Sequence, residues 1–249
     1  MKLFNKVNNK TSQEGVSAPS IFAVEDSRMI YTVSITDNIS DVFIYDEVLM
    51  LLENAEENDE IIFNIASYGG RLDSLLALRS GILSTKATVI GKLVSHACSA
   101  GGMLLLCCHN KIVYPNTTFH AHTASYGSYG KSADIKTQVD FETKQIEKLV
   151  YDIYEGFLDA ENEIPLLLDG KEFYFDAEET IKRLENQALM HDEQQSQAEQ
   201  DFLNSLQDGG VTEIIAELSD EELQEELQLA TEAQKEIKKE IAKRKKGHK

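Results

Sequence analysis

Three times in its first half, the sequence passes from a strand-like to a helix-like hydrophobic pattern, and this alternation is its strongest constraint on the fold. Short β-branched and aromatic runs at 29–35, 60–66 and 87–94 predict strands. Each run leads through a turn into apolar residues at helical spacing, most clearly between Leu72 and Ile82. Parallel strands need long crossover connections of this kind, whereas antiparallel strands can be joined by hairpins. The sequence therefore predicts an α/β domain with a largely parallel sheet.

The second half adds smaller strands and longer helices. Lys111–Tyr114 and Thr117–His122 are predicted to be short strands. In Asp134–Leu158, apolar residues recur at helical spacing and predict a long amphipathic helix. A capping-box pattern at Ser219–Glu222 predicts that the chain is largely helical from there to Lys249.

Changes in composition divide the chain into three parts. Residues 1–20 are polar and lack apolar periodicity, which predicts a flexible N-terminal arm. Residues 21–185 hold the strand and helix patterns and are expected to form one domain. Residues 186–249 are expected to form a helical extension, acidic in 192–232 with 13 Asp or Glu and basic in 235–249 with eight Lys or Arg. This extension is either a solvated helix or a helix that binds a partner or a second copy.

The charge balance and the cysteines exclude several classes of function. The formal net charge is −19 and the sequence pI is near 4.7, so neither nucleic acid nor an anionic membrane surface is an expected partner. The three cysteines, Cys98, Cys107 and Cys108, lie in one apolar stretch. This placement favours reduced, buried thiols and a cytoplasmic compartment. The sequence shows neither a secretory signal after Met1 nor an apolar run long enough to span a membrane.

Ser99 is the candidate nucleophile because it lies where the third predicted strand turns into a helix. Small residues surround it in Ala97–Gly102, so its hydroxyl is expected to be exposed and open to a substrate backbone. The amides at the start of a helix also favour developing negative charge. The same pattern is more commonly that of a serine that only caps a helix.

His122 is the candidate general base, and His120 is the alternative, because both are expected on the same face of one strand. A peptidase serine needs a base that accepts its proton, a group that orients the base, and amide donors for the oxyanion. A core or surface position without a catalytic role is the commoner fate of either histidine. The histidines and cysteines between His96 and His122 match no zinc-site spacing, so no metal is expected.

The spacing of the glycine turn, the serine and the histidine resembles that of the Clp protease proteolytic subunit. Ala66–Gly70 stands in place of that family's Asn-Ser-Pro-Gly-Gly, and Ala97–Gly101 in place of its Ala-Ala-Ser-Met-Gly. Tyr114–Thr117 is similar to the Leu-Pro-Asn-Ser stretch that precedes the family's catalytic histidine, which corresponds to His122. The resemblance covers roughly residues 28–185.

This resemblance implies roles for individual residues. Ser99 corresponds to the family's nucleophile and His122 to its general base, while Gly70 and Ala100 correspond to the two amide donors to the oxyanion. Tyr68 replaces the family's proline in the glycine turn. That difference is expected to reshape the substrate groove rather than to alter the chemistry.

The third catalytic member is open between two carboxylates. Phe173–Thr180 is similar to the segment that follows the family's catalytic Asp, which places Glu172 at the Asp position. A glutamate can orient a histidine as an aspartate does. Asp169, three residues earlier, is the alternative. In a third interpretation both acids lie in a solvated loop, and water or another group orients the histidine.

The resemblance also implies a fold, a reaction and partners. The fold consists of stacked β-α units, as in the crotonase-type enzymes, and its long helix mediates contact between two stacked rings in the family. The reaction is that of a serine endopeptidase that cleaves polypeptides inside a homo-oligomeric chamber, without a metal or organic cofactor. Any ATPase unfoldase must be a separate chain, because this sequence contains no Gly-x-x-x-x-Gly-Lys motif.

Three alternative functions stay open. A virus head-maturation protease uses the same chemistry and often carries an acidic, helical, scaffold-like extension, which residues 186–249 resemble. Capsid or scaffold proteins would then be the partners, and the host cytoplasm or a virion precursor would be the location. A crotonase-type acyl-CoA enzyme would use the glycine-turn amides on a thioester without a Ser-His pair. An inactive assembly protein would keep only the fold.

Overall fold

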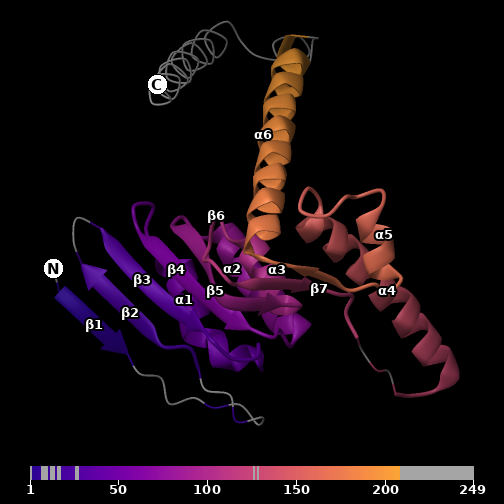
Figure 1. Ribbon diagram of the computed structural model, residues 1–249, viewed down its shortest axis with the longest axis horizontal. Coiled ribbons are helices and arrows are strands. Elements are labelled where there is room, and N and C mark those ends of the chain that lie inside the picture. Colours follow the sequence, from indigo (N-terminus) through magenta and orange to yellow (C-terminus); the bar gives the residue numbers. More distant parts are fainter. Residues whose placement is uncertain are drawn as a thin grey trace, which may run out of the picture. The chain divides into compact units, whose positions relative to one another are not determined.

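The structure is a computed structural model that describes residues 2–6, 11, 15, 18–25, 28–125, 127 and 129–207 (Figure 1). The chain divides into two compact units, Met1–His191 and Asp192–Lys249. The strands and the helices up to the first turns of the last helix belong to the first unit. The helix expected from the capping-box pattern at Ser219–Glu222 lies outside the described residues.

One mixed sheet forms the centre of the first unit, with strands in the order β1-β2-β3-β4-β5-β7-β8 and with β6 also paired to β5 (Figure 1). The strands are β1 (Lys2–Lys6), β2 (Ile21–Glu25), β3 (Met29–Ile35), β4 (Glu60–Ser67), β5 (Thr88–Cys98), β6 (Asn110–Val113), β7 (Thr118–Ala121) and β8 (Phe173–Phe175). The strands β3, β4 and β5 are parallel, and β6 and β7 both run parallel to β5. The remaining pairs, β1-β2, β2-β3 and β7-β8, are antiparallel. The expectation of an α/β fold with a largely parallel central sheet is confirmed.

The helices follow the strands in the alternation that the sequence predicts. They are a 3-10 helix η1 (Val42–Tyr45) and the α-helices α1 (Asp46–Asn54), α2 (Leu72–Ser84), α3 (Ala100–Cys107), α4 (Ser132–Tyr154), α5 (Glu163–Leu168) and α6 (Ala177–Gln207). Helix α2 packs against both α1 and α3, and α3 also contacts β5. Every residue of α3 from Ala100 to Leu106 is buried, which explains why this helix has no polar face.

The strand β5 is long enough to have two successive partners along one edge. Residues Ile90–Leu93 pair with β6, and residues His96–Cys98 pair with β7. On its other edge, the register with β4 shifts between the pairs Ile65–Leu93 and Ser67–Ala97, where β5 contributes extra residues. An irregularity of this kind bends a strand and increases its twist. The bend places the last residues of β5 beside β7, at the carboxyl ends of the central strands.

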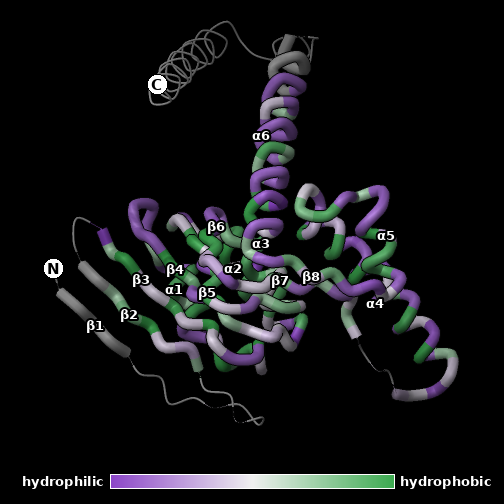
Figure 2. Tube along the Cα trace, viewed as in Figure 1, coloured by the Kyte–Doolittle hydropathy of each residue, from purple (hydrophilic) through white to green (hydrophobic). Residues whose placement is uncertain are grey.

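Three boundaries differ from those expected. Lys2–Lys6, assigned to a flexible arm, forms β1, because its backbone pairs with β2 in a hairpin that local hydrophobicity does not reveal. The long helix ends at Tyr154 instead of Leu158, since Gly156 adopts a φ of +81° and a turn follows. The expected division at residue 185 falls inside α6, which is continuous from Ala177 to Gln207. Figure 2 shows that α6 is mostly hydrophilic, as expected of the extension.

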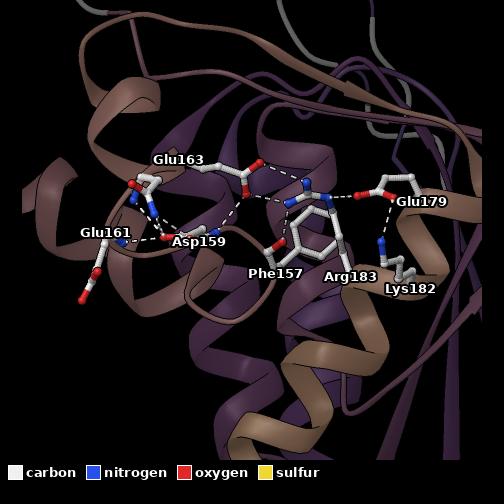
Figure 3. Close-up of polar contacts among 8 residues, drawn as sticks. Phe157, Asp159, Glu161, Glu163, Glu179, Lys182 and Arg183 are labelled. Atoms are coloured by element: carbon white, nitrogen blue, oxygen red, sulfur yellow. Dashed lines mark hydrogen bonds and ion pairs between the residues drawn. The ribbon is translucent and has the colours of Figure 1, made fainter.

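A polar network joins the first turns of α6 to α5 and to the turn before it (Figure 3). The guanidinium of Arg183 donates two hydrogen bonds to Glu163, at 2.7 and 3.0 Å, and one to Glu179 at 2.7 Å. It also donates to the carbonyl of Phe157 at 3.0 Å and lies 4.2 Å from the centre of the Phe175 ring. Because α5 and β8 flank residues 169–172, this network positions the segment that holds the candidate acids.

Candidate active site

Ser99 occupies a constrained turn between β5 and α3. Its φ of +53° and ψ of −125° lie outside the regions that L-residues ordinarily adopt. Its amide donates to the carbonyl of His120 at 2.9 Å, and its carbonyl accepts from the amide of Met103 at 3.0 Å. The backbone is therefore held on both sides, to β7 and to α3. A sharp strand-to-helix turn of this kind is how hydrolases expose a nucleophilic hydroxyl.

The glycine turn after β4 packs directly against Ser99. Gly69 has a φ of +95°, and a Cβ added there would meet the Cys98 carbonyl oxygen at 2.6 Å and the Ser99 Cβ at 2.7 Å. The carbonyl of Gly69 accepts from the amide of Ile39 at 2.7 Å, while the Ile39 carbonyl accepts from Arg71. A Cβ at Gly70 would collide with that same Ile39 carbonyl. The turn therefore requires glycine at both positions, and it brings the backbone close to the serine.

Two amide groups at this junction have no acceptor among the residues that the structure describes. The Ala100 amide is at the first position of α3, where no carbonyl of the preceding turn accepts from it. The Gly70 amide lies on the adjoining turn, and Gly70 is exposed whereas Ala100 is buried. Amides at a helix start carry partial positive charge. Amide donors of this kind are what the oxyanion of a serine peptidase requires.

His122 lies just beyond the end of β7. The strand itself is held to Ser99 by the backbone hydrogen bond from the Ser99 amide to the His120 carbonyl. Nδ1 of His122 lies 2.7 Å from the carbonyl oxygen of Thr123, so Nδ1 carries the hydrogen that is donated to that carbonyl. This tautomer leaves a lone pair on Nε2, the form that a general base needs. Within the described ranges, no hydrogen bond joins the Ser99 hydroxyl to His122, and such contacts are often long in unliganded sites.

Glu172 contacts the neighbouring histidine, His120. Its Oε2 lies 3.4 Å from His120 Nε2 and accepts a hydrogen bond from the Tyr174 hydroxyl at 2.6 Å. The ring of Tyr174 is stacked on that of His120, with centroids 4.0 Å apart. Burial lowers the pKa of His120, and the neighbouring His122 acts in the same direction, while Glu172 opposes them. The hydrogen bond from Tyr174 is the main cause of a lowered pKa of Glu172, to which both histidines also contribute.

The strand register nevertheless relates Glu172 to His122. In the antiparallel pair β7-β8, His120 is opposite Tyr174 and Ala121 is opposite Phe173. Continued by one residue, this register brings Glu172 opposite His122, on the face that His120 shares. The two histidine rings are 5.1 Å apart, which confirms that both lie on one face.

Asp169, the alternative acid, lies at the end of α5 and not on a strand that pairs with the histidine strand β7. It follows the last residue of α5, its amide donates to the Pro165 carbonyl at 3.0 Å, and its side chain is exposed. It contributes to a cavity of about 530 Å³ that is also lined by Thr123 and Ala124, the two residues that follow His122. Asp169 is therefore near the site, although the described contacts do not join it to His122.

Comparison with protein families identifies the family to which the chain belongs. The model of the Clp protease family matches residues 13–183, which include Ser99, His122 and Glu172. The chain belongs to the Clp protease family. Membership indicates peptidase activity of the serine type, and members of the family typically form oligomeric rings and act on polypeptides. No curated protein matches the chain in sequence.

The structure brings the glycine turn and the backbone of His120 against Ser99, and it brings Glu172 against His120, whereas no described contact joins His122, Glu172 or Asp169 to Ser99. Sequence reasoning missed Tyr174 and the Thr123 carbonyl, which hold Glu172 and His122 in their present positions. The alternation of Glu172 and Tyr174 on one strand face was an available signal for the first of these. A backbone carbonyl carries no signal in the sequence.

Neither a metal centre nor a membrane span emerges from the described part of this Clp family chain. No group of three or more metal-ligating side chains comes together among the residues that the structure describes. Among those residues, no helix is both long and apolar enough to cross a membrane. Burial raises the pKa of the Cys107 thiol to about 11 and that of Cys108 further still, so these thiols are protonated at neutral pH.

Proposed function

We propose that this Clp family member is a serine endopeptidase in which Ser99 is the nucleophile and His122 the general base. The observation that carries the proposal is the junction at Ser99. There a strained serine, two amides without acceptors and a histidine in the basic tautomer come from three chain segments. A serine that only caps a helix needs no glycine turn packed against it. It also needs no hydrogen bond from its amide to the carbonyl of His120 on β7.

The reaction follows from this arrangement. The Ser99 hydroxyl oxygen attacks the peptide carbonyl while its proton passes to His122 Nε2, and the amides of Gly70 and Ala100 hold the resulting oxyanion. The peptide C–N bond then breaks as His122 returns the proton to the departing amine, which leaves an acyl group on Ser99. Water attacks that ester with His122 again accepting a proton, and the peptide acid leaves as Ser99 regains its hydrogen.

Glu172 is the better candidate for the third member. The register of β7 and β8, continued by one residue, brings Glu172 opposite His122. Electrostatic interaction with His122 also contributes to the lowered pKa of Glu172, which favours the ionised carboxylate. In the described arrangement the Thr123 carbonyl orients His122, and Glu172 stabilises the positive charge of the site from beside His120.

The setting of the reaction follows from the family. We propose that copies of the chain form stacked rings around a chamber, with α4 at the contact between rings, in the cytoplasm and with any ATPase as a separate chain. The acidic then basic extension favours a second role as a virus head-maturation protease that acts on capsid or scaffold proteins. Removal of the chain's own extension, measured as a lower intact mass that Ser99→Ala prevents, distinguishes this role.

A fluorophosphonate probe tests the catalytic proposal. We expect the probe to label the intact protein once, and Ser99→Ala or His122→Ala to abolish the label. Ser95→Ala is the matched control, since Ser95 is an exposed serine on the same strand, and its hydroxyl forms a hydrogen bond with the ring of His96. Labelling that survives Ser99→Ala would overturn the proposal, as would turnover of a CoA thioester that is unchanged by this substitution.

A further inference from the structure

A cavity built from three segments begins at the two residues that follow His122. Thr123 and Ala124 form the wall nearest the catalytic strand, and Thr123 is also the residue whose carbonyl orients His122. Ile146 and Tyr151 of α4 and Leu168 of α5 supply the apolar part of the lining. At about 530 Å³, the cavity lies within the range of ligand pockets. The link between this cavity and the proposed site is therefore Thr123, which lines the one and orients the base of the other.

The cavity carries negative charge that nothing in its described lining neutralises. Glu147 contributes a carboxylate from α4 and Asp169 contributes another from the end of α5. The described lining contains no Lys, Arg or His. Among the described residues, neither carboxylate takes part in an ion pair, in contrast to Glu163 and Glu179, whose partner is Arg183. Apolar walls with free carboxylates fit a side chain that has an apolar stem and a cationic end.

From this lining we infer that the cavity receives the substrate side chain on the acyl side of the cleaved bond and that it selects lysine or arginine. The inference rests on the proposed function and names its substrate class. The stem of the basic side chain packs on Ile146 and Leu168, and its charge lies between Glu147 and Asp169. The net charge of −19 also attracts cationic polypeptides, in the same direction as the cavity.

This inference assigns Asp169 to substrate selection and leaves Glu172 as the acid of the catalytic group. The two roles give opposite kinetic signatures. An acid that orients the base affects every substrate in proportion, mainly through kcat. An acid that binds a basic side chain affects only substrates that carry one, and its effect weakens as ionic strength rises.

Paired peptide substrates that differ only in lysine or norleucine before the cleaved bond provide the test, because norleucine keeps the stem and removes the charge. We expect the wild type to prefer lysine in kcat/KM by roughly tenfold or more, the effect of one charge-assisted hydrogen bond. Glu147→Gln and Asp169→Asn should each reduce this ratio about tenfold. Glu147→Lys should reverse the preference. Asp140→Asn, on the same helix but outside the cavity, is the matched control and should leave the ratio as in the wild type.

The outcomes separate this inference from the proposed function. Equal or better cleavage of the norleucine peptide by a wild type that takes the fluorophosphonate label would overturn the basic preference while Ser99 catalysis stands. An equal loss for both peptides in Asp169→Asn would make Asp169 a catalytic orienter and overturn its assignment here. Absence of the label would overturn both proposals. Because both residues are exposed, circular dichroism of each variant is expected to match the wild type, and unfolding is measured alongside.

Discussion

Replacing Gly69 with alanine tests the close packing between the glycine turn and the nucleophile. The added Cβ would lie 2.6 Å from the Cys98 carbonyl oxygen, 2.7 Å from the Ser99 Cβ and 2.9 Å from the Ala100 nitrogen. Real Cβ atoms do not approach other atoms this closely, and two of these three neighbours are backbone atoms that cannot rotate away. The turn must therefore move relative to Ser99.

A matched control separates the effect of the dihedral angle from the effect of the contact. Gly170 has a φ of +96°, nearly the +95° of Gly69, but a Cβ there would meet nothing within 4 Å. Positive φ costs a non-glycine residue about 1–2 kcal/mol, which is the expected loss of unfolding free energy for Gly170→Ala. Overpacking adds about 1–3 kcal/mol, so Gly69→Ala should lose roughly 2–5 kcal/mol.

Chemical denaturation measures both losses, and the rate of fluorophosphonate labelling reports the geometry of Ser99. A displacement of about 1 Å at a reacting group reduces a catalysed rate by roughly 100-fold, so we expect labelling of folded Gly69→Ala to slow by that order. The packing argument would be refuted if Gly69→Ala were no less stable than Gly170→Ala and were labelled at the wild-type rate.

Two further predictions concern stability. Arg183→Leu should lower the unfolding free energy by about 2–3 kcal/mol, because it leaves the half-buried Glu163 without its cation. The control Lys182→Ala, at an exposed position of the same helix, should change the unfolding free energy by less than about 0.5 kcal/mol. Losses of similar size for the two variants in urea denaturation would contradict the role of the network. Burial lowers the pKa of His120 in the folded protein, so as the pH falls the imidazole is protonated in the unfolded chain first. The contribution of His120 to the unfolding free energy is therefore fully present above the ordinary pKa of 6.5, and it is lost as the pH falls through the pKa of the folded state. His120→Phe should reduce that decline between pH 7 and 5, and an unaltered pH dependence of the unfolding free energy would show that Glu172 or another group causes it.

The secondary structure was predictable from the sequence because it follows from local periodicity. The run at 29–35 coincides with β3, and the apolar spacing after Gly70 coincides with α2. The site was predictable in part for the same reason, since small residues around Ser99 at a strand-to-helix transition mark a tight turn. Gly70, Ser99 and His122 are each weak evidence of a catalytic site when taken alone. Their common spacing, which is shared with the Clp proteases, makes the prediction specific.

The structure contributed what depends on contacts between distant segments. No local pattern shows that β5 pairs with β6 along one part and with β7 along another, because both partners follow it closely in the chain. The hairpin of β1 with β2 was missed because polar, mixed sequences form edge strands only when a partner backbone is available.

The sequence by itself determined the α/β alternation, the family and the identities of the nucleophile and base candidates, since these depend on residue type and spacing along the chain. Only the tertiary structure decided that Glu172 lies against His120 and Tyr174, that the Thr123 carbonyl sets the His122 tautomer, and that Asp169 faces a cavity. The physical reason is that these relations depend on side-chain directions and on how β7, β8, α4 and α5 pack, and short-range periodicity records neither.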